Sequence, residues 1–125
     1  MINKYFLEEP NILDLSKEIF NAVVDENLKI KTRFELISKK IEDAETVNFI
    51  LADGLGFSNL QSTDSFLNKH INNVVNTTFP SSTNVALTTI AMQANPIDHG
   101  VFSYYMYDKL KYGLINALNW NSENK

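Results

Sequence analysis

The chain has 125 residues, which is enough for one ordinary domain, and 44% of them are hydrophobic, which excludes a disordered composition. The formal net charge is −4, and no run of basic residues predicts binding to nucleic acid or to a membrane surface. There is no cysteine, which excludes disulfides, thiolate zinc sites and cysteine nucleophiles. With neither a signal peptide nor an apolar run of bilayer-spanning length, we expect a cytoplasmic protein.

The N-terminal part predicts helices. Asn11 follows Pro10 and is suited to cap a helix, and Asp25 to Asn27 forms a polar break after it. Residues 10–46 are therefore expected to form leader helices. Two apolar stripes at helical spacing support this: Ile12, Leu15, Ile19 and Val23, and then Phe34, Ile37 and Ile41.

The apolar run from Val47 to Ala52 predicts a strand. It is too short for a buried helix, and it has the near-continuous apolar pattern of a central, parallel strand. Asp53 follows at its carboxyl end, and Gly54 and Gly56 permit a tight turn.

Helical and β-prone segments alternate through the remainder of the chain. We expect one or two short helices over 57–71, broken near Ser62 and Thr63, and a helix over 85–93 that Asn95 and Pro96 end. Residues 74–78, 101–107 and 115–120 are β-prone, and residues 80–82 predict a turn. This alternation predicts the α/β class, with residues 47–120 forming the sheet region of a single domain.

Asp53 has two interpretations. A carboxylate at the carboxyl end of a parallel strand lies where α/β proteins bind ligands, and its oxygens suit a divalent metal ion. Alternatively, Asp53 and Gly54 form only a turn, and the carboxylate caps the next helix.

Thr83 also has two interpretations. It follows the turn at Pro80 and opens a helix, where free backbone amides attract anions and favour a nucleophilic alkoxide. Alternatively, Ser81, Ser82 or Thr83 is an ordinary N-cap.

His99 lies in the sequence Asp98-His99-Gly100, which is similar to a metal motif. A single histidine in a loop is equally able to fix that loop through a hydrogen bond. His70 is expected to be exposed or to interact with the end of a helix.

Taken in order, these motifs resemble the alkaline-phosphatase superfamily, and within it the type I phosphodiesterase/nucleotide pyrophosphatase family and its bacterial relatives. The resemblance runs from about Pro10 to Trp120. The matching stretches are Phe49 to Gly56, Thr78 to Thr83, Ala86 to Thr89 and Pro96 to Val101.

The resemblance implies an α/β/α sandwich with a mainly parallel sheet and a site for two divalent metal ions, zinc. It implies that Asp53 is a metal ligand and that Thr83 is both a ligand and the nucleophile that attacks a phosphate ester or nucleotide. A water activated by the second metal ion would then release the phosphoryl group. Asn84 and Tyr104 fall in the implied substrate and oxyanion pocket, and Tyr104 stands where many members have an asparagine. Structural motif positions are Gly54, Gly56, Pro80, His99 and Gly100.

The family that this chain resembles uses more metal ligands than this chain contains. The family site uses further Asp and His ligands, and each zinc ion takes about four. We therefore expect the N-terminal portion of a hydrolase, truncated relative to the family and active only with a complementing C-terminal chain. Two alternatives are a non-catalytic remnant or split-enzyme subunit that binds a partner, and a sulfatase, phosphonate hydrolase or phosphosugar mutase on the same scaffold. Unpaired edges of the strand Val47 to Ala52 also predict a chain that is marginally stable or self-associates.

Overall fold

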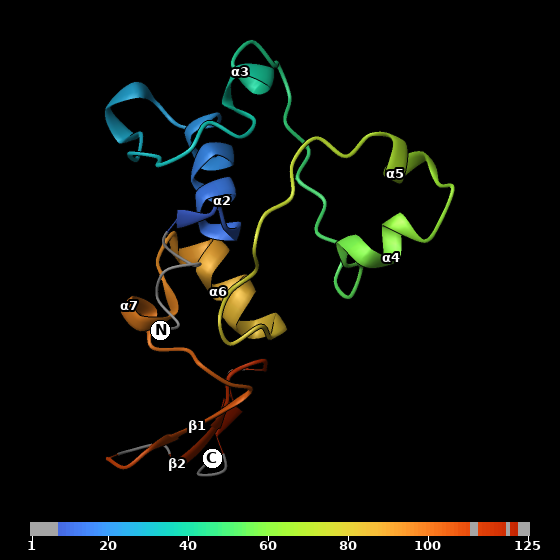
Figure 1. Ribbon diagram of the computed structural model, residues 1–125. Helices are drawn as coiled ribbons and strands as arrows, with labels where there is room; N and C mark the ends of the chain where they lie inside the picture. The colour runs from blue at the N-terminus through green and yellow to red at the C-terminus, as the bar shows by residue number, and fades with distance from the viewer. Residues whose placement is uncertain (1–7, 111–112, 120, 123–125) are drawn as a thin grey trace.

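The computed structural model describes residues 8–110, 113–119 and 121–122 (Figure 1). Its helices are α2 (Ile12–Asn21), η1 (Glu26–Leu28), α3 (Ser38–Ile41), α4 (Phe57–Gln61), α5 (Phe66–Lys69), α6 (Thr83–Met92) and α7 (Pro96–His99). Its strands are β1 (Tyr105–Asp108), β2 (Gly113–Asn116) and β3 (Asn121–Ser122). The chain thus combines helices and strands, as the sequence predicts.

The two long helices, α2 and α6, pack against each other in the middle of the molecule (Figure 1). The predicted cap of α2 is confirmed, because the Asn11 side chain accepts hydrogen bonds from the amides of Leu13 and Asp14. The Asp14 carboxylate in turn accepts a hydrogen bond from the Asn11 amide at 3.0 Å, and the reciprocal bonds form a capping box.

Asp14 also ties α2 to the following loop. Its carboxylate is buried and accepts hydrogen bonds from Arg33 Nε at 2.8 Å and from Nη2 at 2.6 Å. Burial by itself raises the pKa of Asp14, but the hydrogen bonds from Arg33 and the Asn11 amide, with the nearby positive charges, outweigh burial and lower it. The carboxylate is thus charged in the folded chain and fixes the residues between α2 and α3.

The prediction of a central strand from Val47 to Ala52 is wrong. Residues 47–52 belong to no helix or strand, and they lie between α3 and α4 with residues 48–52 exposed (Figure 1). A parallel strand is stabilised by neighbours on its edges. Among the residues that the structure describes, no other strand lies beside this run.

The predicted mainly parallel sheet is not found among the described residues either. The sheet that the described residues form has three antiparallel strands in the order β1-β2-β3, with Met106 opposite Ile115. Strands β1 and β2 follow each other closely along the chain, so they pair locally without a crossover connection. The parallel pairing that the structure does contain is an isolated bridge between Asn11 and Asn76, within the predicted β-prone stretch 74–78.

Several helix predictions are confirmed. Short helices α4 and α5 occupy 57–71 with a break between them, and α6 covers most of 85–93. The β-prone run 101–107 contributes to β1, and 115–120 contributes to β2, while Trp120 lies outside the described residues. None of the helices in the described part of the chain has both the length and the apolar character that a bilayer-spanning helix requires.

The buried apolar core is small and lies between α6 and the sheet. Val85, Val101 and Ala117 form it, and Met106 packs against it. The Ala117 amide donates to the Tyr104 carbonyl at 2.7 Å, which holds the end of β2 beside the start of β1. This core fixes the first turn of α6, and with it the position of Thr83.

Candidate functional site

Thr83 and Asp53 meet in the structure although 30 positions separate them in the sequence. The Thr83 hydroxyl donates a hydrogen bond to Asp53 Oδ2 at 3.0 Å. The Tyr104 hydroxyl in turn donates to Thr83 Oγ1 at 3.1 Å. Three of the residues that the sequence singles out therefore form one hydrogen-bonded set at the surface, with Thr83 in the middle.

The loop conformation explains how Asp53 reaches this position. Gly54 has φ of +73°, a left-handed conformation that glycine adopts without strain, and it turns the chain directly after Asp53. Gly56 has an ordinary extended φ of −80° and begins α4 as its N-cap. Asp53 therefore lies in a turn, as its alternative interpretation states, but it is not the cap of α4.

Thr83 is not a helix cap either. The N-cap of α6 is Ser82, and Thr83 is the first residue of the helix. The Ser82 hydroxyl donates instead to Asn84 Oδ1 at 2.9 Å. The turn before the helix contains a cis peptide bond at Phe79–Pro80, and Thr78 Oγ1 donates to the Pro80 carbonyl at 2.8 Å. Thr83 is thus left with a hydroxyl that faces Asp53 and not the backbone of its own helix.

Asn84 is placed in the interior and not in an open pocket. It is buried, and its side-chain amide donates to the Ser103 carbonyl. This bond links α6 to the segment that carries Tyr104. Asn84 therefore positions Tyr104 next to Thr83, and its own polar atoms are already occupied.

His99 lies apart from this set and is held by two contacts. The Val101 amide donates to Nδ1 at 3.1 Å, so the ring proton of the neutral imidazole lies on Nε2, which is 3.0 Å from Thr89 Oγ1. Burial lowers the pKa of His99, and the charge of Asp98 opposes this only in part. Gly100, with φ of +75°, ends α7 directly after it.

Thr89 is a residue that the sequence did not single out. It is buried on α6, and its hydroxyl is the contact of His99 Nε2. The two residues are ten positions apart, across the turn between α6 and α7. A threonine on the inner face of a helix gives no sequence signal for this pairing.

A cavity of about 750 Å³ opens beside Asp53 and Thr83. Its walls come from the segment 51–57, from Val75 and Thr77, and from Ala86 and Leu87 on α6. Asp53 is the charged residue among its lining. A volume of this size is within the range of small-molecule sites.

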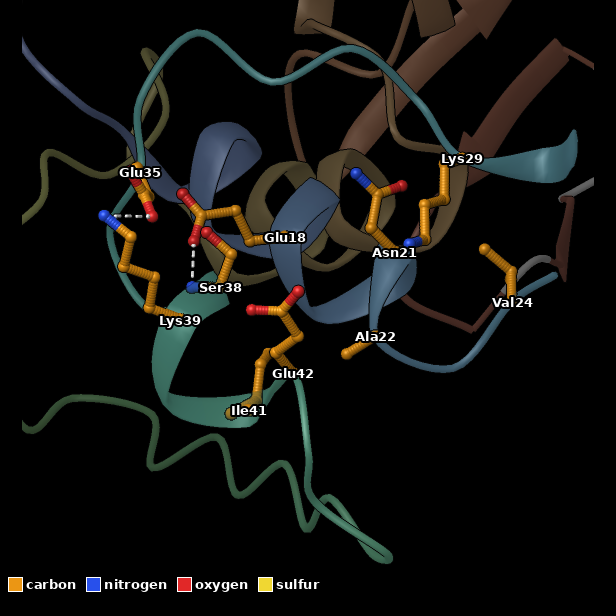
Figure 2. A pocket seen from close by; sticks show the side chains of 10 residues that line it. All are labelled: Glu18, Asn21, Ala22, Val24, Lys29, Glu35, Ser38, Lys39, Ile41 and Glu42. Carbon is orange, nitrogen blue, oxygen red and sulfur yellow. Dashed lines mark hydrogen bonds and ion pairs between the residues drawn. The ribbon is translucent and has the colours of Figure 1, made fainter. Parts of the chain in front are cut away.

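A second cavity, of about 420 Å³, lies between α2 and α3 (Figure 2). Glu18 belongs to its lining, but its buried carboxylate accepts hydrogen bonds from the amides of Leu36, Ile37 and Ser38 at 2.6 to 2.7 Å. Glu35 at the rim pairs with Lys39 at 3.2 Å. Glu18 thus holds the loop before α3 in place.

The supply of metal ligands is limited. Across the residues that the structure describes, no group of three or more His, Asp or Glu side chains is placed to hold a metal ion. Asp53 and Thr83 together offer adjacent oxygen atoms, which are fewer than the roughly four ligands of a zinc site. These residues by themselves do not fit a resident zinc ion.

Comparison of the chain with models of protein families, with curated proteins and with solved structures gave no match.

Proposed function

We propose that this chain is part of a metal-dependent phosphoric ester hydrolase, similar to the type I phosphodiesterases and nucleotide pyrophosphatases, with Thr83 as its nucleophile. The observation that carries this proposal is the hydrogen bond from Thr83 Oγ1 to Asp53 Oδ2 at 3.0 Å. Asp53 lies in a turn, but neither residue's side chain caps a helix, so both oxygen groups are available to each other. A hydroxyl held on a carboxylate is the arrangement that an activated nucleophile needs.

The groups of the chain account for the first proton transfer. As Thr83 Oγ1 forms its bond to phosphorus, its proton passes along the existing hydrogen bond to the Asp53 carboxylate. The bond from phosphorus to the leaving oxygen breaks, its electron pair stays on that oxygen, and a proton from water completes the alcohol. The Tyr104 hydroxyl lies 3.1 Å from Thr83 Oγ1 and stabilises the negative charge that develops on Oγ1 as its proton leaves.

The second step releases the phosphoryl group. Water adds to phosphorus and releases a proton to solvent, the bond between phosphorus and Thr83 Oγ1 breaks, and the threonine oxygen regains its proton from Asp53. The substrate class is a phosphate ester or nucleotide. The proposed enzyme takes two divalent metal ions, zinc, and because Asp53 and Thr83 alone do not fit such an ion, the remaining ligands belong to another polypeptide segment.

The test uses the full chain, tagged and isolated from its own cells together with whatever binds to it. Hydrolysis of bis(4-nitrophenyl) phosphate is measured with added zinc. Thr83→Ala is expected to lower the rate at least about a thousandfold, because the covalent step loses its oxygen nucleophile. Acid quenching during turnover is expected to trap a phosphoryl group on the peptide that contains Thr83.

Two variants control this experiment. Thr83→Ser keeps the hydroxyl and is expected to retain measurable turnover. Thr77→Ala removes a hydroxyl from the wall of the same cavity and is expected to leave the rate unchanged. Wild-type turnover in Thr83→Ala would exclude Thr83 as the nucleophile, and no hydrolysis by any preparation would refute the proposed activity.

A further inference from the structure

The cavity beside Asp53 and Thr83 has an apolar wall. Large apolar side chains from separate parts of the chain line it: Ile12, Leu51, Leu55, Phe57, Val75 and Leu87. The three leucines are 42 to 45% exposed, so each retains apolar surface that a bound group can cover. Because water is a poor solvent for apolar surface, a wall of this kind favours an apolar occupant.

Two relationships in the sequence bring this wall next to the proposed nucleophile. Leu87 lies four positions after Thr83 on α6, and residues at that spacing are neighbours on one face of a helix. Leu51 and Leu55 lie two positions before and after Asp53, whose carboxylate accepts the hydrogen bond from Thr83 Oγ1 at 3.0 Å. An ester group bonded to a phosphorus atom at Thr83 therefore lies beside the apolar wall.

The charge of the lining has one sign. Asp53 contributes a negative charge, and among the described residues that line the cavity none is Lys, Arg or His. A carboxylate or a further phosphate on the ester group would lose water there and face Asp53 without a compensating cation. Other polar residues of the lining, such as Asn59 and Ser81, are uncharged. An uncharged ester group avoids both the loss of hydration and the repulsion.

We infer that this cavity receives an uncharged, apolar ester group of the substrate, either aryl or alkyl. The inference rests on the proposed function, because the cavity binds a substrate of this kind only if Thr83 attacks phosphorus. The preferred substrates are then phosphodiesters with apolar ester groups, whose negative charge lies on the reacting phosphoryl group itself. A nucleoside diphosphate or triphosphate places additional negative charge against Asp53 and is a poorer substrate.

Two symmetric diesters test this specificity: diphenyl phosphate and bis(3-carboxyphenyl) phosphate. Both ester groups of each compound are the same, so the comparison does not depend on which group leaves. Release of the phenol is measured with the full chain, isolated from its own cells with whatever binds to it and supplied with zinc. The value of kcat/KM is expected to be at least about tenfold higher for diphenyl phosphate.

Two variants place a cation in the wall. Leu87→Lys and Leu55→Lys are each expected to lower the ratio of the two kcat/KM values at least about tenfold, because the ammonium group attracts the carboxylate and interrupts the apolar surface. Both leucines are partly exposed, so the chain tolerates a lysine at either position. The matched control is Leu67→Lys on α5. Leu67 is 53% exposed and lies outside the lining, so this substitution is expected to leave the ratio unchanged.

The outcomes separate this specificity from the proposed activity. An active preparation with equal kcat/KM for the two diesters would overturn the specificity and leave Thr83 as the nucleophile. A ratio that stays at its wild-type value in both Leu87→Lys and Leu55→Lys would also overturn it. No hydrolysis of these diesters or of bis(4-nitrophenyl) phosphate would refute the proposed activity, and this inference with it.

Discussion

At the scale of single residues, His99 shows how a local contact makes stability depend on pH. Its Nδ1 atom accepts from the Val101 amide, and its Nε2 atom lies against buried Thr89. Both contacts suit the neutral ring, and burial lowers the pKa of His99 below the ordinary value of 6.5. Between the folded and unfolded pKa values, the unfolded chain therefore binds more protons than the folded chain.

His99 stabilises the folded chain less as the pH falls. The contribution of His99 to the free energy of unfolding is fully present above pH 6.5 and is lost as the pH falls through the lowered pKa. We expect the urea midpoint of the wild-type chain to fall between about pH 7.5 and about pH 5, and His99→Gln to show a smaller fall. The same substitution at exposed His70 serves as the control. An equal fall in His99→Gln and wild type would contradict this role for His99.

At the scale of elements, α3 depends on a carboxylate from another helix. α3 is only four residues long, too short to be stable alone, and its N-cap Ile37 makes no side-chain cap. Glu18 on α2 supplies the missing acceptors by accepting hydrogen bonds from the amides of Leu36, Ile37 and Ser38. Figure 2 shows the bond from Ser38. The negative charge also faces the positive end of the helix.

Glu18→Gln tests this anchor with almost no change of shape. One carboxylate oxygen becomes an amide nitrogen that faces backbone N–H groups, so at least one buried donor loses its acceptor. We expect the free energy of unfolding to fall by about 2 kcal/mol, and the amides of residues 36–38 to exchange faster. Glu42→Gln, in the lining of the same cavity, is the matched control and is expected to change stability by less than about 0.5 kcal/mol. Equal stability of the two variants would exclude an anchoring role for Glu18.

At the scale of the whole molecule, little apolar surface is buried. Among the described residues the buried apolar side chains are Leu13 and the cluster Val85, Val101 and Ala117. Phe66, Ile50 and Leu110 are among many large apolar side chains that are exposed. A chain with this distribution gains stability from association, because a dimer removes part of its exposed apolar surface from water.

Thermal unfolding measures this gain. If the chain self-associates through its exposed apolar surface, Ile50 included, the melting temperature of the wild-type chain rises with protein concentration, by about 5 °C over a roughly hundredfold increase. In Ile50→Lys the melting temperature is expected to vary much less with concentration. A wild-type melting temperature that is independent of concentration would exclude coupled dimerisation and unfolding.

Local patterns predicted the elements that depend on nearby residues. The cap at Asn11, the broken helices α4 and α5, and helix α6 are encoded by residues a few positions apart, because capping and helical periodicity act over one or two turns. The strand at residues 47–52 was predicted wrongly for the complementary reason. An apolar run becomes a strand only where a second strand supplies hydrogen bonds, and none lies beside it among the described residues.

The candidate site, too, was predictable from the sequence only in part. The sequence by itself identified Asp53 and Thr83 as residues whose chemistry suited a common site, the family resemblance added Tyr104, and both left open whether the first two were a turn and a cap. The tertiary structure shows Asp53 in a turn and Ser82, not Thr83, at the N-cap of α6, and the turn at Gly54 and the packing of α6 bring the Thr83 hydroxyl to Asp53 Oδ2 at 3.0 Å. A hydrogen bond across 30 positions depends on where the chain returns in space, and residue type and spacing do not determine that return.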